Sequence, residues 1–282
     1  MDTAALPLHR PQAGEWLAGP LDALKAHWPE YLMEAWGLGT FMVSAGVFGT
    51  LLFHPASPVA RAVPGPLALR ALMGVLMGLT AVALIYSPWG RQSGAHLNPA
   101  VTLTFLRLGK VRPWDALFYV LAQAAGGTLG VLLVAAALGP LFREPPVAYV
   151  ATVPGEAGAA VALLAEALIS LVLMTVILLA TNTPRLARLT GVLAGLLVAL
   201  FITVEAPFSG MSMNPARSLA SALPAGLWQA FWIYLVGPPA GMLLAVELYR
   251  ALRRSPEVVC AKLVHHTHRR CIFRCGYATK GP

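Results

Sequence analysis

Six apolar stretches, each long enough to cross a membrane, constrain this chain more than any other feature. A transmembrane helix needs about 20 consecutive apolar residues to cross a hydrocarbon core of roughly 30 Å. The chain is 57% hydrophobic and only 11% charged, whereas soluble domains carry about 25% charged residues. We therefore expect an all-α membrane protein with six spans, at residues 31–53, 67–87, 114–142, 157–181, 186–206 and 227–249.

Two further apolar segments are too short to cross a membrane, and both begin with the same motif. They cover residues 98–109 and 214–223, so their helices would be about 18 Å and about 15 Å long. Each begins at Asn-Pro-Ala, within "SGAHLNPAVTL" at 93–103 and "SGMSMNPARSL" at 209–219. Each half of the chain then reads span, span, half-helix, span. We expect an inverted repeat with two re-entrant half-helices, because three spans turn the second half over in the membrane.

These patterns predict three parts of the chain. An N-terminal tail covers residues 1–30 and a Cys/His-rich basic tail covers residues 254–282. Between them lies a membrane core at 31–253, with a first repeat at 31–142 and a second at 157–253.

The distribution of Lys and Arg predicts an orientation. With both termini in the cytoplasm, the cytoplasmic side carries all of the 20 Lys and Arg residues except Arg61, Arg70, Arg143 and Arg217. This asymmetry follows the positive-inside rule for a plasma (inner) membrane. The net charge of +8 is then explained by membrane orientation, and we expect a lipid bilayer rather than nucleic acid as the partner.

Two half-helices entering from opposite faces would meet near the middle of the membrane, N-terminus to N-terminus. Each helix N-terminus carries roughly half a positive charge, so together they would repel cations and hydronium but not water. The amides of Asn98 and Asn214 could donate hydrogen bonds to water there and interrupt a chain of proton transfer. Asparagine is also an ordinary helix cap, but a cap alone does not explain two inverted copies. The predicted half-helix starts are Asn98, Pro99, Ala100, Asn214, Pro215 and Ala216.

Three charged residues fall inside apolar segments. Arg217 lies about one helical turn beyond Asn214, so both can face the same lumen; the alternative is a side chain that reaches the headgroups. Glu34 and Glu166 occupy matching first spans. We interpret them as structural carboxylates that accept hydrogen bonds from the re-entrant backbone, and a proton-relay acid is the alternative.

The chain resembles the aquaporin and glycerol-facilitator (major intrinsic protein) family, in its bacterial water-channel-like form, over about residues 31–252. The resemblance rests on the two Asn-Pro-Ala motifs, on Glu34 and Glu166, and on "YVLAQAAGG" and "YLVGPPAG". It implies a pore in each monomer and a homotetramer.

The family's selectivity filter uses four positions. Arg217 matches the family's arginine by motif, and Met211 matches the neighbouring loop position. The second-span position falls on Met77 or Gly78, and the fifth-span position falls near Ile202. Water channels of the family usually present an aromatic residue and a histidine here, and glycerol channels two aromatics. This chain shows neither pair.

The expected permeant is water, because glycerol-type members tend to have Asp after the arginine and this chain has Ser218. Glycerol, hydrogen peroxide, ammonia and gases remain alternatives. A second hypothesis is an ion-coupled secondary transporter, since inverted repeats and broken helices build those too. Its midplane acid would be Glu34, Glu166 or Glu205. We expect no catalytic residues and no enzyme activity.

The C-terminal tail suggests a separate role that a pore does not explain. Three readings stay open: a soft-metal site, with a metal-dependent sensor or enzyme as its extension, a redox-sensing thiol set, and a basic segment on anionic lipid. Apart from that metal we expect no cofactor. The candidate ligands are Cys260, His265, His266, His268, Cys271 and Cys275.

Overall fold

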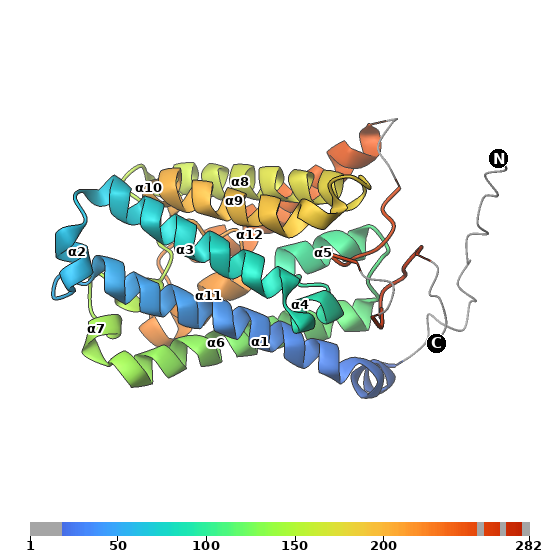
Figure 1. Ribbon diagram of the computed structural model, residues 1–282, viewed down its shortest axis with the longest axis horizontal. Coiled ribbons are helices and arrows are strands. Elements are labelled where there is room, and N and C mark those ends of the chain that lie inside the picture. The colour runs from blue at the N-terminus through green and yellow to red at the C-terminus, as the bar shows by residue number, and fades with distance from the viewer. Residues whose placement is uncertain (1–18, 253–256, 266–268, 278–282) are drawn as a thin grey trace.

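The computed structural model describes residues 19–252, 257–265 and 269–277, and within these residues the regular elements are all helical. Six helices are long and apolar enough to cross a membrane, which confirms the predicted all-α fold with six spans (Figure 1). They are α1 (Pro20–Phe53), α3 (Pro66–Tyr86), α6 (Pro113–Leu138), α8 (Gly158–Thr181), α9 (Thr190–Val204), which follows a short 3-10 turn, and α12 (Trp232–Ala251).

The two short apolar segments form half-helices α5 (Pro99–Arg107) and α11 (Pro215–Ala225). Each is preceded by a one-turn helix that was not predicted, α4 (Pro88–Ser93) before the first and α10 (Ala206–Ser209) before the second. The short connecting elements are α2 (Pro58–Ala62), α7 (Pro140–Arg143), η2 (Ala148–Val150) and η3 (Ala187–Leu189).

The predicted boundaries differ from the structure by a few residues at most ends, and three of the differences have a clear description. The first span was expected to begin at residue 31, but α1 begins at Pro20 and passes through Pro29 without a break. The third span ends at Leu138 rather than at residue 142, because Gly139 adopts a positive φ of 54° and Pro140 starts α7. The last span begins at Trp232, five positions later than the expected residue 227.

The long helices pack as repeat-related pairs, α1 along α6 and α8 along α12, while α3 packs along α9 across the two halves. Glycines permit the close approach of the backbones. A Cβ on Gly126 would lie 2.0 Å from the carbonyl oxygen of Ala35, and one on Gly241 2.0 Å from that of Ala167. No side chain fits there, so small residues at these positions let the helices touch, as in other membrane bundles.

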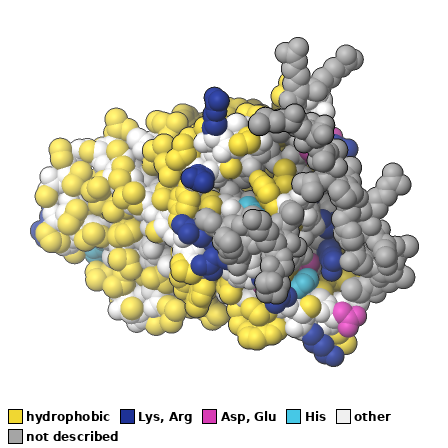
Figure 2. Space-filling model, turned by 45° about the vertical axis from the view of Figure 1, so that its right-hand side comes forward, with side chains coloured by type: hydrophobic (Ala, Val, Ile, Leu, Met, Phe, Trp, Pro, Cys, Tyr) yellow, Lys and Arg dark blue, Asp and Glu magenta, His cyan; other side chains and the backbone are white. Residues whose placement is uncertain are grey.

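The outer faces of the spans are apolar and exposed. Leu133 and Leu164 are 65% and 70% exposed, which suits contact with lipid tails. Figure 2 shows hydrophobic side chains over most of the left-hand part of the molecule, while most of the visible Lys and Arg side chains lie in the middle and the right-hand part of the view. This surface identifies the chain as a membrane protein.

The described C-terminal segments pack against the membrane core. Within the predicted tail at residues 254–282, segments 257–265 and 269–277 lie beside α5 and α4 (Figure 1). Their apolar residues join the same core cluster as α5, including Val258, Ala261, Leu263, Val264, Ile272 and Phe273. Isolated apolar residues in a short polar segment carry no periodic signal, so the sequence did not predict this packing.

Candidate pore

A cavity of about 690 Å³ lies inside the six-helix body. Helix α3 lines it from Pro66 to Ile85, a stretch of about 29 Å at the rise of an α-helix. This length is close to the thickness of a bilayer's hydrocarbon core, roughly 30 Å. Residues near Pro66 and Pro146 line one end, and Leu263 of the C-terminal segment lines the other.

The two re-entrant loops adopt the same unusual backbone. Gly94 and Gly210 have φ angles of 101° and 79° and end the one-turn helices α4 and α10. Beyond each glycine two non-glycine residues also have positive φ: Ala95 (54°) and Leu97 (49°) in the first loop, Met211 (51°) and Met213 (54°) in the second. Such conformations cost about 1–3 kcal/mol each, so the surroundings must hold both loops in place.

Buried carboxylates provide that support at equivalent positions. Glu34 accepts hydrogen bonds from the Ser93 hydroxyl at 2.6 Å and from the backbone N–H groups of His96 (3.1 Å) and Leu97 (2.6 Å). Its Oε2 also accepts from the amide of Gln123 at 2.8 Å. Each charge-assisted bond of this kind is worth more than a neutral one.

Glu166 repeats the pattern in the second half. It accepts from the Ser209 hydroxyl and from the N–H groups of Ser212 and Met213, each at 2.7 Å. Glu34 and Glu166 are both fully buried, and neither is among the described side chains that line the cavity.

Asn98 and Asn214 cap the half-helices and also join them. The Asn98 Oδ1 accepts from the Ala100 N–H at 2.8 Å, and the Asn214 Oδ1 accepts from the N–H groups of Ala216 and Arg217 at 3.1 and 3.2 Å. The side-chain nitrogens reach across the junction. Asn98 Nδ2 donates to the carbonyl of Met213 and Asn214 Nδ2 to that of Leu97, each at 2.7 Å.

These reciprocal bonds bring the N-termini of α5 and α11 together beside the cavity, which both asparagines line. Pro99 and Pro215 take the first helical position, where their fixed φ is favourable and no N–H is needed. Each amide nitrogen has two N–H groups, so the bond across the junction leaves a second donor. The helix dipoles add partial positive charge at the same depth.

Residues at all four predicted filter positions line the cavity: Met77, Ile202, Met211 and Arg217. Arg217 Nη1 is buried and has no hydrogen-bond partner among the residues that the structure describes. An arginine with an unused donor beside a cavity can bind a polar permeant and repel cations.

Gly78, the other candidate in the second span, lies at a helix contact instead. A Cβ on Gly78 would be 2.5 Å from the carbonyl oxygen of Gly195 in α9. Adjacent helix positions differ in direction by about 100°, so Met77 faces the cavity while Gly78 faces α9. Ser218, just after the arginine, hydrogen-bonds Thr152 at 2.7 Å and Ser212 at 2.6 Å, which ties the re-entrant loop to the segment after η2.

His96 also lines the cavity, and sequence reasoning did not single it out. Its Nε2 lies 2.9 Å from the carbonyl of Ala261 in the C-terminal segment. A carbonyl can only accept, so Nε2 carries the proton. The His96 ring also stacks on Phe105 and Phe273, with centroids 5.2 and 5.3 Å apart. The sequence did contain a signal for this residue, because His96 is a polar residue between Gly94 and the first Asn-Pro-Ala motif.

The structure gathers four of the six tail candidates, Cys260, His265, Cys271 and Cys275, with their ligand atoms all within 4.8 Å of one another. The other two candidates, His266 and His268, lie outside the described residues.

The fold and the cavity define a class of protein: a membrane protein with two inverted repeats whose half-helices meet beside a cavity as long as the spans. The sequence profile of the Major intrinsic protein family matches residues 27–249. The chain therefore belongs to this family.

Named relatives and a solved structure agree with that assignment. The Putative aquaporin NIP4-1 of Arabidopsis thaliana is 40% identical over 181 residues, which is 64% of this chain and 62% of that protein. Aquaporin NIP1-2 of Oryza sativa subsp. japonica is 34% identical over 221 residues, 77% of this chain and 69% of that protein. The X-ray structure of the aquaglyceroporin from Plasmodium falciparum superposes with a TM-score of 0.66 at 20% identity, over 80% of this chain and 96% of that one.

The alignments to these plant relatives cover only part of each protein. The match to the Probable aquaporin NIP-type of Nicotiana alata covers 65% of this chain and 66% of that protein. The likeness to the aquaglyceroporin, at 20% identity, concerns the fold.

Proposed function

We propose that the chain is a passive channel that conducts water across a membrane and excludes protons and ions. One observation carries the proposal: the N-termini of α5 and α11 meet beside a cavity as long as the spans, joined through Asn98 and Asn214. A water oxygen that accepts from both amides would point its hydrogens away from the junction in both directions. Proton transfer along a water chain would be interrupted there while water itself passes.

Several further features belong to the same proposal. The channel would lie in the plasma membrane with both termini in the cytoplasm, following the distribution of Lys and Arg. It would be a homotetramer with one pore per chain, as the family resemblance implies. It would carry out no enzymatic reaction, and water would be its main partner apart from the bilayer.

A second candidate function is conduction of small neutral solutes such as glycerol, hydrogen peroxide, ammonia or gases. The observation that favours it is the filter itself, where three of the four side chains, Met77, Ile202 and Met211, are apolar. Methionine is unbranched and adapts its shape, so this section could admit a solute with an apolar edge.

The experiment is stopped-flow shrinkage of proteoliposomes in response to an osmotic step, with a panel of neutral solutes as the second arm. A channel gives water flux well above empty liposomes, with low activation energy and no dependence on a pH gradient. Uptake that requires a proton or sodium gradient would instead indicate a transporter, with Glu34, Glu166 or Glu205 as its acid. The ratio of solute to water permeability decides between the two channel functions.

A further inference from the structure

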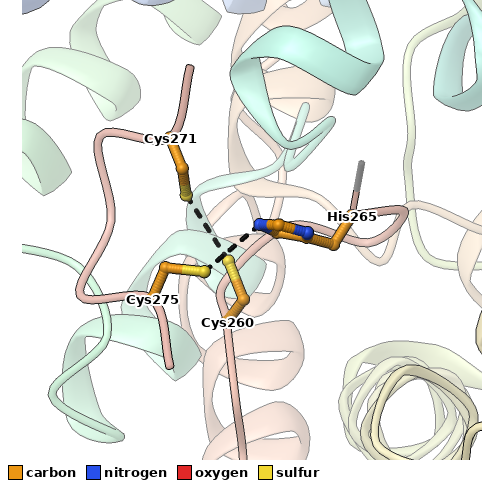
Figure 3. A group of neighbouring side chains, drawn as sticks. All are labelled: Cys260, His265, Cys271 and Cys275. Atoms are coloured by element: carbon orange, nitrogen blue, oxygen red, sulfur yellow. Dashed lines mark hydrogen bonds between the residues drawn. The ribbon is translucent and has the colours of Figure 1, made fainter. Parts of the chain in front are cut away.

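The four residues near the end of the chain form a compact set of metal-ligand atoms. Cys260, His265, Cys271 and Cys275 come from two loop segments and point toward one common centre (Figure 3). The Sγ atoms of Cys260 and Cys271 are 3.6 Å apart, and Cys275 Sγ is 3.2 Å from His265 Nε2. They include every cysteine of the chain, although 15 residues separate the first from the last.

These separations are close to the edges of a tetrahedral zinc site. With Zn–S bonds of about 2.3 Å and Zn–N bonds of about 2.0–2.1 Å, tetrahedral geometry places two sulfurs about 3.8 Å apart and a sulfur and a nitrogen about 3.6 Å apart. All four ligand atoms lie within 4.8 Å, so shifts of a few tenths of an ångström to about 1 Å would complete the coordination. Three thiolates and one imidazole make a Cys₃His set, which structural zinc sites use.

A metal ion binds cysteine in its thiolate form, and all three cysteines of the chain lie together here. The cluster is half-buried to buried, which suits a structural site more than a reactive surface thiol.

The two other readings of this segment fit less well. A disulfide would use two of the three cysteines and leave the third, together with His265, without a role. Anionic lipid would need the basic side chains to face outward, but several contact the protein. Lys262, which is 2% exposed, donates to the carbonyls of Arg91 at 3.2 Å and Arg270 at 2.6 Å.

Two further basic side chains also reach the channel body. Arg269 donates to the carbonyl of Pro88 at 3.0 Å, and Arg270 donates to that of Ala26. The segment is therefore attached to the membrane body from several sides.

The same segment covers one end of the cavity. The Leu263 N–H donates to the carbonyl of Gly94 at 3.1 Å, and the Leu263 side chain lines the cavity. His96 hydrogen-bonds Ala261 and stacks on Phe273. Leu263 lies between two of the candidate ligands, Cys260 and His265. A metal ion bound to both would therefore fix the two ends of the short loop that contains Leu263.

We propose that Cys260, His265, Cys271 and Cys275 bind one Zn²⁺ ion per chain, and that this ion holds the loop containing Leu263 across the end of the cavity. The proposed zinc site does not depend on the proposed channel function. The proposed effect of zinc on the loop containing Leu263 does rest on that function, because it would limit water flow through the pore.

The first experiment measures zinc in the purified full-length chain, prepared without a histidine tag. Elemental analysis should give one zinc per chain after incubation with Zn²⁺ and dialysis. Replacement by Co²⁺ should give the intense visible bands of a tetrahedral thiolate site. Cys271→Ser should weaken Zn²⁺ binding at least about 10-fold, measured by competition with a chromophoric chelator.

The matched control is His54→Ala, which removes a histidine at the end of α1, far along the chain from the cluster. It should keep one zinc per chain with unchanged affinity. Absence of bound zinc in the native chain, or equal affinity in Cys271→Ser, would overturn the site. A thiol titration that finds a disulfide in the native chain would overturn it as well.

The second experiment measures water permeability of the same proteoliposomes with zinc bound, after a chelator, and after zinc is returned. Water flux should rise when zinc is removed and fall when it is returned, while Cys271→Ser should show the high flux in all three conditions. Equal flux with and without zinc, when zinc loss has been measured, overturns the role of the ion at the pore end. Water flux no higher than that of protein-free liposomes in all three conditions would overturn the proposed channel function. The measured zinc content would still show whether the four residues bind zinc.

Discussion

At the scale of single residues, the wall of the cavity combines one charge with apolar neighbours. Arg217 has a donor without a partner among the described residues, and Met77, Ile202 and Met211 line the same cavity. Residues with a supporting role lie outside the cavity, with Glu34 and Glu166 bonded to the loop backbone. Substitutions of the cavity-lining residues should therefore change selectivity, whereas substitutions of the supporting residues should lower stability.

Arg217→Val should raise the permeability to cations and to larger solutes. At an effective dielectric constant of 20, a charge about 8 Å from the permeant contributes about 2 kcal/mol, which corresponds to roughly 30-fold in rate. Ion conductance in planar bilayers and solute flux in liposomes measure the change. Arg61→Gln is the control, since this exposed arginine lies in the short helix α2 that follows α1. Unchanged conductance and selectivity would show that Arg217 is not the barrier.

Glu166→Gln should destabilise the chain more than it changes selectivity. The amide that replaces one carboxylate oxygen cannot accept from Ser209, Ser212 and Met213 together, and a buried donor without a partner costs about 1–3 kcal/mol. Thermal unfolding in detergent measures the loss. Glu247→Gln is the control, because that carboxylate is half-exposed in an ion pair with Arg107. A stability equal to that of the control would contradict the structural role.

At the scale of elements, the sequence predicts the helices that apolar runs and motifs define, but it does not predict how distant segments pack against one another. Six spans and two half-helices follow from runs of apolar residues and from the Asn-Pro start of each half-helix. The choice between Met77 and Gly78 depends on how α3 is rotated against α9, which a single sequence does not contain. The docking of the C-terminal segment depends on partners such as His96 and Ala261, which are 165 positions apart.

Gly126→Ala should separate α1 from α6. The added methyl would lie 2.0 Å from the carbonyl oxygen of Ala35, and backbone cannot move aside as a flexible side chain can. We expect lower thermal stability and lower yield of folded protein, measured by size-exclusion chromatography with a fluorescent fusion. Gly19→Ala, whose new methyl would have its nearest neighbour 3.8 Å away, should behave as the unchanged chain. Equal behaviour of the two variants would mean that the helices tolerate a wider spacing.

At the scale of the whole molecule, both halves line the cavity, and Leu263 of the C-terminal segment contributes to its wall. The half with α8, α9 and α12 repeats the packing of the half with α1, α3 and α6, and both present apolar faces outward. A pore inside each chain means that assembly with other copies is not needed to form it.

We expect the chain to be a tetramer in the membrane and each chain to conduct independently. Native mass spectrometry from mild detergent should give a fourfold mass. Co-reconstitution with an excess of a blocked variant should lower water flux in proportion to the fraction of blocked chains. A steeper than proportional loss, or a monomer mass, would contradict this assembly.

The reciprocal bonds at the middle of the molecule make each half depend on the other. The Asn98 side-chain nitrogen donates to a carbonyl of the second half, and that of Asn214 donates to a carbonyl of the first. A peptide consisting of one half would lack this acceptor, and a buried polar group without a partner is costly. We therefore expect one half by itself to be stable only as two copies inserted in opposite directions. Because this chain contains each half once, the two halves can differ in sequence, as Val101 and Arg217 do.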